Sequence, residues 1–221
     1  MEFLPLAEEA GLMRPLTTVV LDRALGQCAA WRADGHRVTM SVNISVSNLL
    51  DDGLIDLVAR ALDRHRVPAE AVTLEITETT IINDFQRSKI AVDRLQEMGL
   101  GVSVDDFGAG YTSLAYLSGL AVDEMKLDRT FVSALTADAG RAIPLLRATI
   151  ELGHAMGLCV VAEGIEDQAT LELLAELGCD RGQGYVIGRP VAAADVALGS
   201  PALPAPATPT SLQSPASMST Q

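Results

Sequence analysis

The chain has 221 residues, of which 48% are hydrophobic and 20% charged, a composition that fits a globular protein with a substantial core. Its 29 acidic and 16 basic residues give a formal net charge of -13, which argues against a nucleic acid polymer as partner because the charges would repel. The three cysteines lack C-x-x-C spacing, which argues against a disulfide framework and a thiolate zinc site. The sequence shows no export signal and no membrane-spanning segment, so we expect a cytoplasmic protein.

Apolar strand-like runs alternate with segments of helical periodicity along most of the chain. The first helix is expected to begin near Pro15 and to end at Asp34-Gly35. Its buried side is expected to consist of Leu16, Val19, Val20, Ala24, Cys28 and Trp31. The expected strands cover residues 38–43, 72–77, 101–105, 123–127, 158–162 and 180–185, and the later helices cover residues 54–65, 84–98, 139–156 and 168–177. This alternation predicts a parallel sheet with right-handed crossovers.

The composition changes at Gly199. From there to residue 221 the chain is rich in Pro, Ala, Ser and Thr and contains no charged residue. A segment of this kind buries too little apolar surface to fold. We therefore expect one domain over residues 1–198 and a disordered tail over residues 199–221.

Polar side chains, most of them acidic, stand where each expected strand ends. They are Asn43, Glu75, Asp105 with Asp106, Lys126 with Asp128, Glu163, and Gln183. Each of them alone has an ordinary structural explanation, as a cap, a turn residue or a surface ion pair. The carboxyl ends of parallel strands meet on one face, however, so we expect these side chains to converge there.

Carboxylates that converge in this way repel one another unless cations neutralise them. Oxygen ligands without His or Cys favour Mg²⁺ or Mn²⁺ over zinc or copper. The adjacent Asp105 and Asp106 suit a pair of ions, since one carboxylate can bridge both while its neighbour binds the second. Paired ions of this type are typical of phosphoryl chemistry.

Six short motifs occur in the order and approximate spacing of a known family. They are Asn43-Ile44-Ser45, Glu75-Ile76-Thr77-Glu78, Asp105-Asp106-Phe107-Gly108-Ala109-Gly110-Tyr111, Lys126-Leu127-Asp128, Ala162-Glu163-Gly164-Ile165-Glu166 and Gln183-Gly184-Tyr185. From about residue 3 to residue 190 the chain resembles EAL domains, which are cyclic di-GMP phosphodiesterases. The resemblance implies an α/β fold of the TIM-type (β/α) barrel class with about six of its eight strands present. It also implies hydrolysis of cyclic di-GMP to linear pGpG with Mg²⁺ or Mn²⁺.

The resemblance implies metal-binding roles for five residues by matched position. Asn43, Glu75 and Asp105 resemble the ligands of a first ion, with Asp105 bridging to a second ion that Asp106 binds. Glu163 resembles a carboxylate at the second ion that has also been proposed as general base. Two ions are therefore expected in a complete domain.

Five further residues receive supporting roles from the same resemblance. Lys126 is expected to position or polarise the attacking water, and Gln183 resembles a residue of the site. Glu78 resembles the residue that anchors the Asp-Asp-Phe-Gly loop and links it to a dimer interface. Asp128 and Glu166 are expected to support the site, and a homodimer is a possible assembly.

Residues 3–9 resemble the segment that follows the first two strands of the family. The Glu-Ala-Leu signature, whose glutamate completes the first metal site, is therefore expected to be absent. Three interpretations stay open: part of an active phosphodiesterase, a catalytically degenerate module that binds cyclic di-GMP or a protein, or a fragment that folds poorly. In a longer product, a sensor or diguanylate cyclase-like domain would lie upstream.

Overall fold

Six strands form one parallel sheet whose order follows the chain, β1-β2-β3-β4-β5-β6. The computed structural model describes residues 3–108 and 117–198, so the expected tail at 199–221 lies outside the described residues. The strands are β1 (Met40–Ile44), β2 (Val72–Thr77), β3 (Gly101–Phe107), β4 (Glu124–Leu127), β5 (Cys159–Ala162) and β6 (Arg181–Gly182). The predicted parallel α/β sheet of six strands is therefore confirmed.

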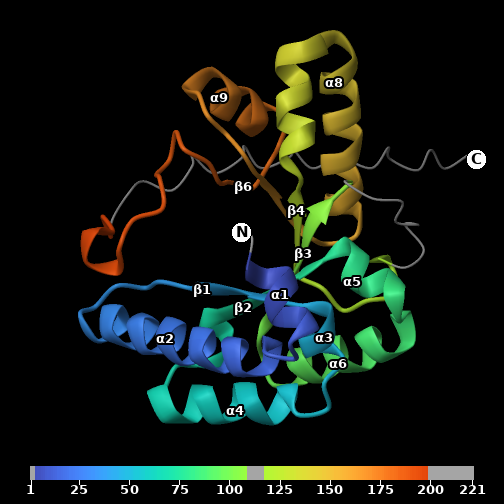
Figure 1. Cartoon of the computed structure of the whole chain (residues 1–221). Coiled ribbons are helices and arrows are strands. Elements are labelled where there is room, and N and C mark those ends of the chain that lie inside the picture. Colours follow the sequence, from blue (N-terminus) through green and yellow to red (C-terminus); the bar gives the residue numbers. More distant parts are fainter. Residues whose placement is uncertain (1–2, 109–116, 199–221) are drawn as a thin grey trace, which may run out of the picture.

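Helices follow one another along the chain between the strands, and the first helices precede β1. They are α1 (Phe3–Glu9), α2 (Met13–Ala33), α3 (Val46–Leu49), α4 (Leu54–His65), α5 (Glu78–Asn83), α6 (Phe85–Glu97), α8 (Arg129–Ala155) and α9 (Gln168–Glu176), with short 3₁₀ turns at Ala69–Ala71 and Ala193–Asp195. Figure 1 shows α2 and α6 next to the first strands, α4 against α2, and α8 and α9 next to the last strands. No helix in the described part of the chain has the length and apolarity that a bilayer crossing needs.

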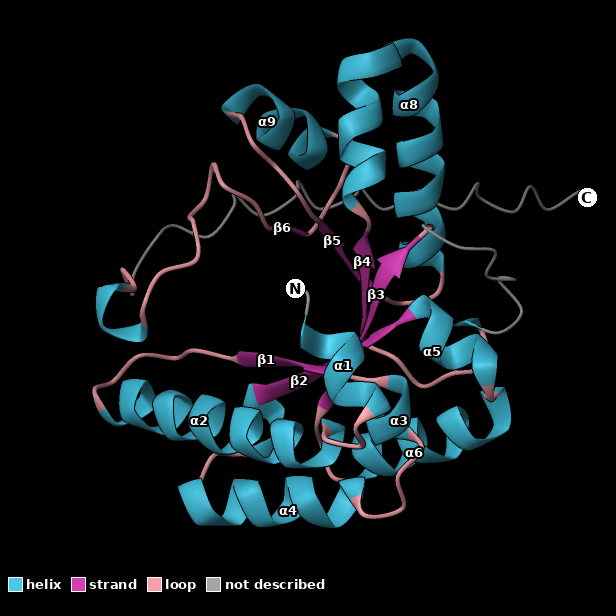
Figure 2. Ribbon diagram, viewed as in Figure 1, coloured by secondary structure: helices cyan, strands magenta, loops and turns pink. Residues whose placement is uncertain are grey.

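Helix α8 consists of two segments that meet at Asp138, whose φ of -156° and ψ of 82° are not helical. The Asp138 side chain accepts a hydrogen bond from the Arg141 amide at 3.3 Å and so caps the second segment. The two segments run side by side as a hairpin in Figure 2. The sequence predicted only the second of them, which begins near residue 139.

Alternation along the strands separates an apolar face from a polar one. Leu74, Ile76, Val102 and Val104 are almost completely buried on the helix-facing side, where they form the core. Helix α8 approaches this face closely at Gly153, because an added Cβ there would lie 2.6 Å from Val160 Cγ2. The opposite faces of β2, β3 and β4 carry Glu75, Asp105 and Lys126, respectively.

The predicted buried side of the first helix is right for Cys28 and wrong for Val19 and Val20. Val19 and Val20 are 50% and 41% exposed, whereas the buried residues of α2 are Thr17, Leu21, Leu25 and Cys28. The buried stripe includes Thr17 because the Asn48 side-chain amide donates a hydrogen bond to the Thr17 hydroxyl. Leu21, Leu25 and Cys28 pack into the core on the same side, so the apolar stripe of α2 lies next to the one expected from the sequence.

Strand β6 is shorter than the predicted strand over residues 180–185, because the chain turns at Gly184. A Cβ at this position would collide with the backbone of Ile165, so only glycine fits. The Gln183 amide still donates to the Ala162 carbonyl oxygen at 2.8 Å. The strand therefore ends directly before Gln183.

Candidate active site

The ammonium group of Lys126 lies among three carboxylates from neighbouring strands. Its Nζ is 3.1 Å from Glu75 Oε2, 3.1 Å from Asp105 Oδ1 and 2.6 Å from Glu163 Oε1. Lys126 is 4% exposed, so solvent screens these ion pairs weakly. The convergence expected from the strand ends is present for these four residues.

Charge and burial act in opposite directions on Lys126. Burial by itself would lower the pKa of the ammonium group, but the hydrogen bond to Glu163 and the charges of Glu75, Glu163 and Asp105 raise this pKa well above its usual range. Lys126 is therefore a permanent cation and hydrogen-bond donor at neutral pH. Burial raises the pKa of Glu163, although the Lys126 ammonium opposes that shift.

Asp105, Asp106 and Glu163 form an acidic cluster in which one carboxylate oxygen of each lies within 4.8 Å of the others. Consecutive residues of a regular strand point to opposite faces, so two adjacent aspartates need a special backbone to join one cluster. Asp106 has a φ of 56°, in the left-handed region, and the pairing of β3 with β4 shifts register between Val104 and Phe107. The distortion costs on the order of 1–2 kcal/mol, typical of strain at functional positions.

The donor set of this cluster fits a hard divalent cation. Three carboxylate oxygens within 4.8 Å of one another are the chemistry that Mg²⁺ and Mn²⁺ prefer. Burial raises the pKa of Asp106, and the charges of Asp105 and Asp128 raise it further, so negative charge is in excess here. Glu75 lies beside this cluster in contact with Lys126, and Asn43 is the register partner of Glu75 on β1.

Glu78 and Asp128 hold the segments on either side of the cluster. The buried Glu78 carboxylate accepts a hydrogen bond from the Gly108 amide at 2.8 Å, which ties α5 to the end of β3. Gly108 has a φ of 93°, and a Cβ there would collide with the Phe131 ring. Asp128 caps α8 by accepting from the Thr130 amide at 2.9 Å.

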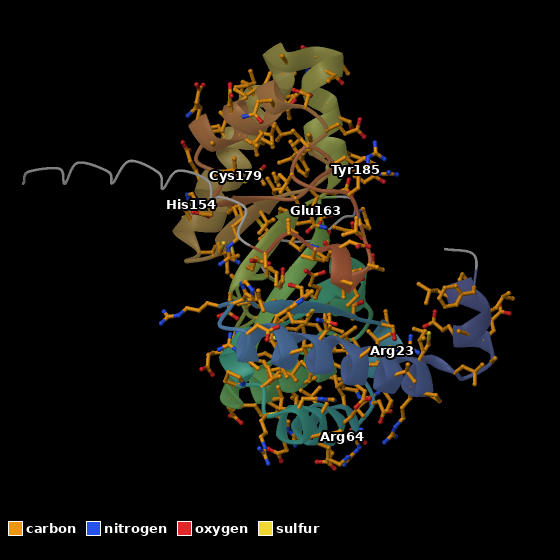
Figure 3. The ribbon with its side chains drawn as sticks, turned by 90° about the vertical axis from the view of Figure 1, so that its left-hand side faces the viewer. Arg23, Arg64, His154, Glu163, Cys179 and Tyr185 are labelled. Carbon is orange, nitrogen blue, oxygen red and sulfur yellow. The ribbon has the colours of Figure 1, made fainter. Side chains whose placement is uncertain are left out.

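A cavity of about 740 Å³ adjoins the cluster, a volume in the range of small-molecule sites. Glu163, Glu166 and Gln183 line it together with Arg129 and Tyr185. Figure 3 shows Glu163 and Tyr185 on the same side of the molecule. Sequence reasoning missed Arg129 and Tyr185; Tyr185 follows Gln183 in its motif, whereas no motif residue pointed to Arg129.

Comparison with known proteins gives matches that include the residues of this site. The sequence model of the EAL domain matches residues 1–190. The chain is 41% identical over 193 residues to the bifunctional diguanylate cyclase/cyclic di-GMP phosphodiesterase MucR of Pseudomonas aeruginosa, covering 87% of the chain and 28% of that protein. It is 38% identical over 190 residues to the cyclic di-GMP phosphodiesterase PA2567 of the same organism, covering 86% and 32%. The chain thus spans about a third or less of these curated relatives.

Two solved structures share the fold. The phosphodiesterase of MucR in complex with c-di-GMP aligns with a TM-score of 0.82 and 40% identity, covering 86% of this chain and 76% of that one. The EAL domain of Mycobacterium smegmatis DcpA aligns with a TM-score of 0.77 and 34% identity, covering 83% and 82%. These matches confirm the expected TIM-type barrel class. Together with the profile match over residues 1–190, they show that the chain belongs to the EAL domain family.

Proposed function

We propose that this chain is a hydrolase that cleaves cyclic di-GMP to linear pGpG at the Lys126 site with two divalent cations, Mg²⁺ or Mn²⁺. The observation that carries the proposal is the cluster of Asp105, Asp106 and Glu163, with carboxylate oxygens within 4.8 Å of one another beside a buried lysine. The names of the relatives, two of which are cyclic di-GMP phosphodiesterases, support the choice of substrate.

In this proposal Asn43, Glu75, Asp105, Asp106 and Glu163 would hold the ions. The ions would supply a nucleophilic hydroxide at neutral pH and neutralise charge on the phosphodiester. The donor types support this role, because all five side chains offer oxygen. A water oxygen adds to phosphorus, the bond from phosphorus to one ribose oxygen breaks, and that oxygen takes up a proton.

The residues around the ions have distinct tasks. Lys126 stays protonated and pairs with three carboxylates, and its proposed role is to position or polarise the attacking water. Lys126 already holds Oε1 of Glu163 at 2.6 Å, so Oε2 of Glu163 is the candidate acceptor of the water proton. Gln183 lines the cavity and would bind the substrate through its amide.

Glu78, Asp128 and Glu166 act as supports in the proposal. Glu78 keeps the turn after Asp106 in place through the Gly108 amide. The proposal also includes residues 1–198 as the domain, a homodimer as its assembly, and a sensor or diguanylate cyclase-like domain upstream in a longer product. The bifunctional name of MucR supports the last of these.

The test is direct. The purified chain is incubated with cyclic di-GMP and Mn²⁺ or Mg²⁺, and pGpG is measured by chromatography. We expect Asp105→Asn to lower the rate by about 100-fold or more, because it removes a charged metal ligand. Asp56→Asn, on the exposed side of α4, is the matched control and should retain full activity. A folded chain that makes no pGpG with either ion refutes the proposal, and binding without cleavage would favour the binding module instead.

A further inference from the structure

Gln183 depends on a short edge strand for its position. Only Arg181 and Gly182 of β6 pair with β5, opposite Val161 and Ala162. Beyond them, the Gln183 amide donates to Ala162 and its carbonyl oxygen accepts from the Ile165 amide at 3.1 Å. Edge strands with few ladder bonds open locally at low cost, so other contacts must hold β6 in place.

An ion pair across the sheet supplies one such contact. Arg181 Nη1 lies 2.7 Å from Glu124 Oε2, which links β6 to β4 across the intervening β5. Glu124 precedes Lys126 by two residues and Arg181 precedes Gln183 by two, so each shares the strand face of its partner in the site. The pair therefore joins the strand of the buried lysine to the strand of Gln183.

Because Glu124 is buried, loss of this ion pair should destabilise the fold more than loss of a surface salt bridge. The Glu124 side chain is 11% exposed, although that of Arg181 is 66% exposed. The register partners of Glu124 are Ser103 and Cys159, and neither carries a positive charge. Among the residues that the structure describes, Arg181 is the cation paired with Glu124, so its loss would leave this buried carboxylate unpaired, which costs much more than loss of an exposed pair.

The opposite face of β6 has a second anchor at the preceding residue. Asp180 Oδ2 accepts a hydrogen bond from the Val160 amide at 2.7 Å and contacts His154 Nε2 at 2.9 Å. Figure 3 shows His154 on the same helix-covered side as Cys179, away from Tyr185. Two consecutive side chains thus hold the start of β6 from both faces.

We propose that Arg181 is a positioning residue that, through its ion pair with Glu124, keeps Gln183 in place beside Glu163 in the cavity. The kinetic part of this proposal rests on the proposed function, with Gln183 contacting the substrate. The structural part concerns the β6 edge alone and is independent of catalysis.

The experiment compares Arg181→Met, Glu124→Gln, Gln183→Ala and the double variant Arg181→Met/Gln183→Ala, with Arg60→Met on α4 as the matched control. Amide hydrogen exchange is measured for residues 183–187 and, as an internal reference, for residues 72–77 of β2. We expect Arg181→Met to speed exchange at 183–187 by about tenfold and to leave 72–77 unchanged, since the loss is local. Arg60→Met should change neither.

Kinetics with cyclic di-GMP then test whether Arg181 acts through Gln183. We expect Arg181→Met to raise KM by about fivefold or more with kcat within about twofold, and Glu124→Gln to act in the same direction. In the Gln183→Ala background, Arg181→Met should cause no further rise in KM, because the effects of two residues that act through one group are not additive. A purely structural role would lower stability and activity in both backgrounds.

Two results overturn the proposal. One is unchanged exchange at 183–187 in Arg181→Met, and the other is a full additional KM effect in the Gln183→Ala background. If the unsubstituted chain makes no pGpG, the proposed function fails, whereas the exchange comparison still decides whether the ion pair holds β6.

Discussion

Replacement of Lys126 by methionine tests the electrostatics of the site without any assay of turnover. The lysine is 4% exposed and pairs with Glu75, Asp105 and Glu163 at 2.6–3.1 Å. Methionine keeps the apolar stem but leaves three carboxylates facing one another, and removal of one partner from a buried ion pair costs about 3–5 kcal/mol. At about 2–4 °C per kcal/mol for a domain of this size, the melting temperature in EDTA should fall by about 6–20 °C.

The matched control is Lys89→Met on α6. Lys89 pairs with Asp93 at 2.9 Å, but the two side chains are 38% and 39% exposed. The substitution should therefore lower the free energy of unfolding by less than about 0.5 kcal/mol. Differential scanning fluorimetry measures both variants. Added Mn²⁺ should stabilise Lys126→Met more than the unsubstituted chain, because the cation replaces the missing positive charge. Melting of Lys126→Met within about 2 °C of the unsubstituted chain would refute the assignment of Lys126 as the electrostatic centre.

The pH dependence of this contribution follows from the direction of the shift. The folded pKa of Lys126 is raised above its ordinary value of 10.5, so its stabilising contribution is fully present below that value. The contribution is lost only as pH rises through the folded pKa. The difference in stability between the unsubstituted chain and Lys126→Met should therefore stay constant between pH 7 and pH 9.

Two further predictions concern the same end of the sheet. Gly184→Ala should lower the free energy of unfolding in urea by about 1–3 kcal/mol or more, because the new Cβ collides with the Ile165 backbone, whereas Gly188→Ala, with open space around it, should change little. Burial raises the pKa of the Cys179 thiol to about 12, so iodoacetamide at pH 8 should label this residue far more slowly in the native chain than in guanidinium; equal rates would contradict the structure.

The convergence of the site residues could be predicted from the sequence because the parallel topology of the sheet determines which residues lie together. Residues at the ends of successive parallel strands must meet, and the ladder pairs Asn43 with Glu75 and Thr77 with Asp105 as that rule requires. Hydropathy alone locates the strand ends, and the parallel topology predicts that residues at those ends lie together. Lys126 and Glu163 could therefore be predicted as neighbours without knowledge of any contact. The specific roles of these residues stay predictions.

Other features depend on contacts between distant segments, which hydropathy does not encode. Thr17 is buried on α2 where its hydroxyl meets the side chain of Asn48, and the Glu124–Arg181 pair joins residues 57 positions apart. The left-handed backbone conformation of Asp106 could not be predicted from the sequence either. Glycine is the residue that usually signals this conformation, and the motif does not show that side chains 105 and 106 depart from the regular alternation of a strand. The hydropathy pattern predicted the helices and strands, whereas tertiary contacts determined which side of each is buried and where each ends.

The charge balance of the site supports the proposal of two ions instead of one. Glu75, Asp105, Asp106 and Glu163 bring four negative charges, and Lys126 offsets one of them, which leaves an excess of three. One divalent cation would leave the site negative and repel the single charge on a phosphodiester, whereas two would make it positive by one. Since the whole chain carries a net charge of -13, the proposed anionic substrate has no general attraction to rely on. Arg129 in the cavity lining supplies one positive charge and the ions would supply the rest, so cyclic di-GMP should bind more weakly when EDTA removes the ions.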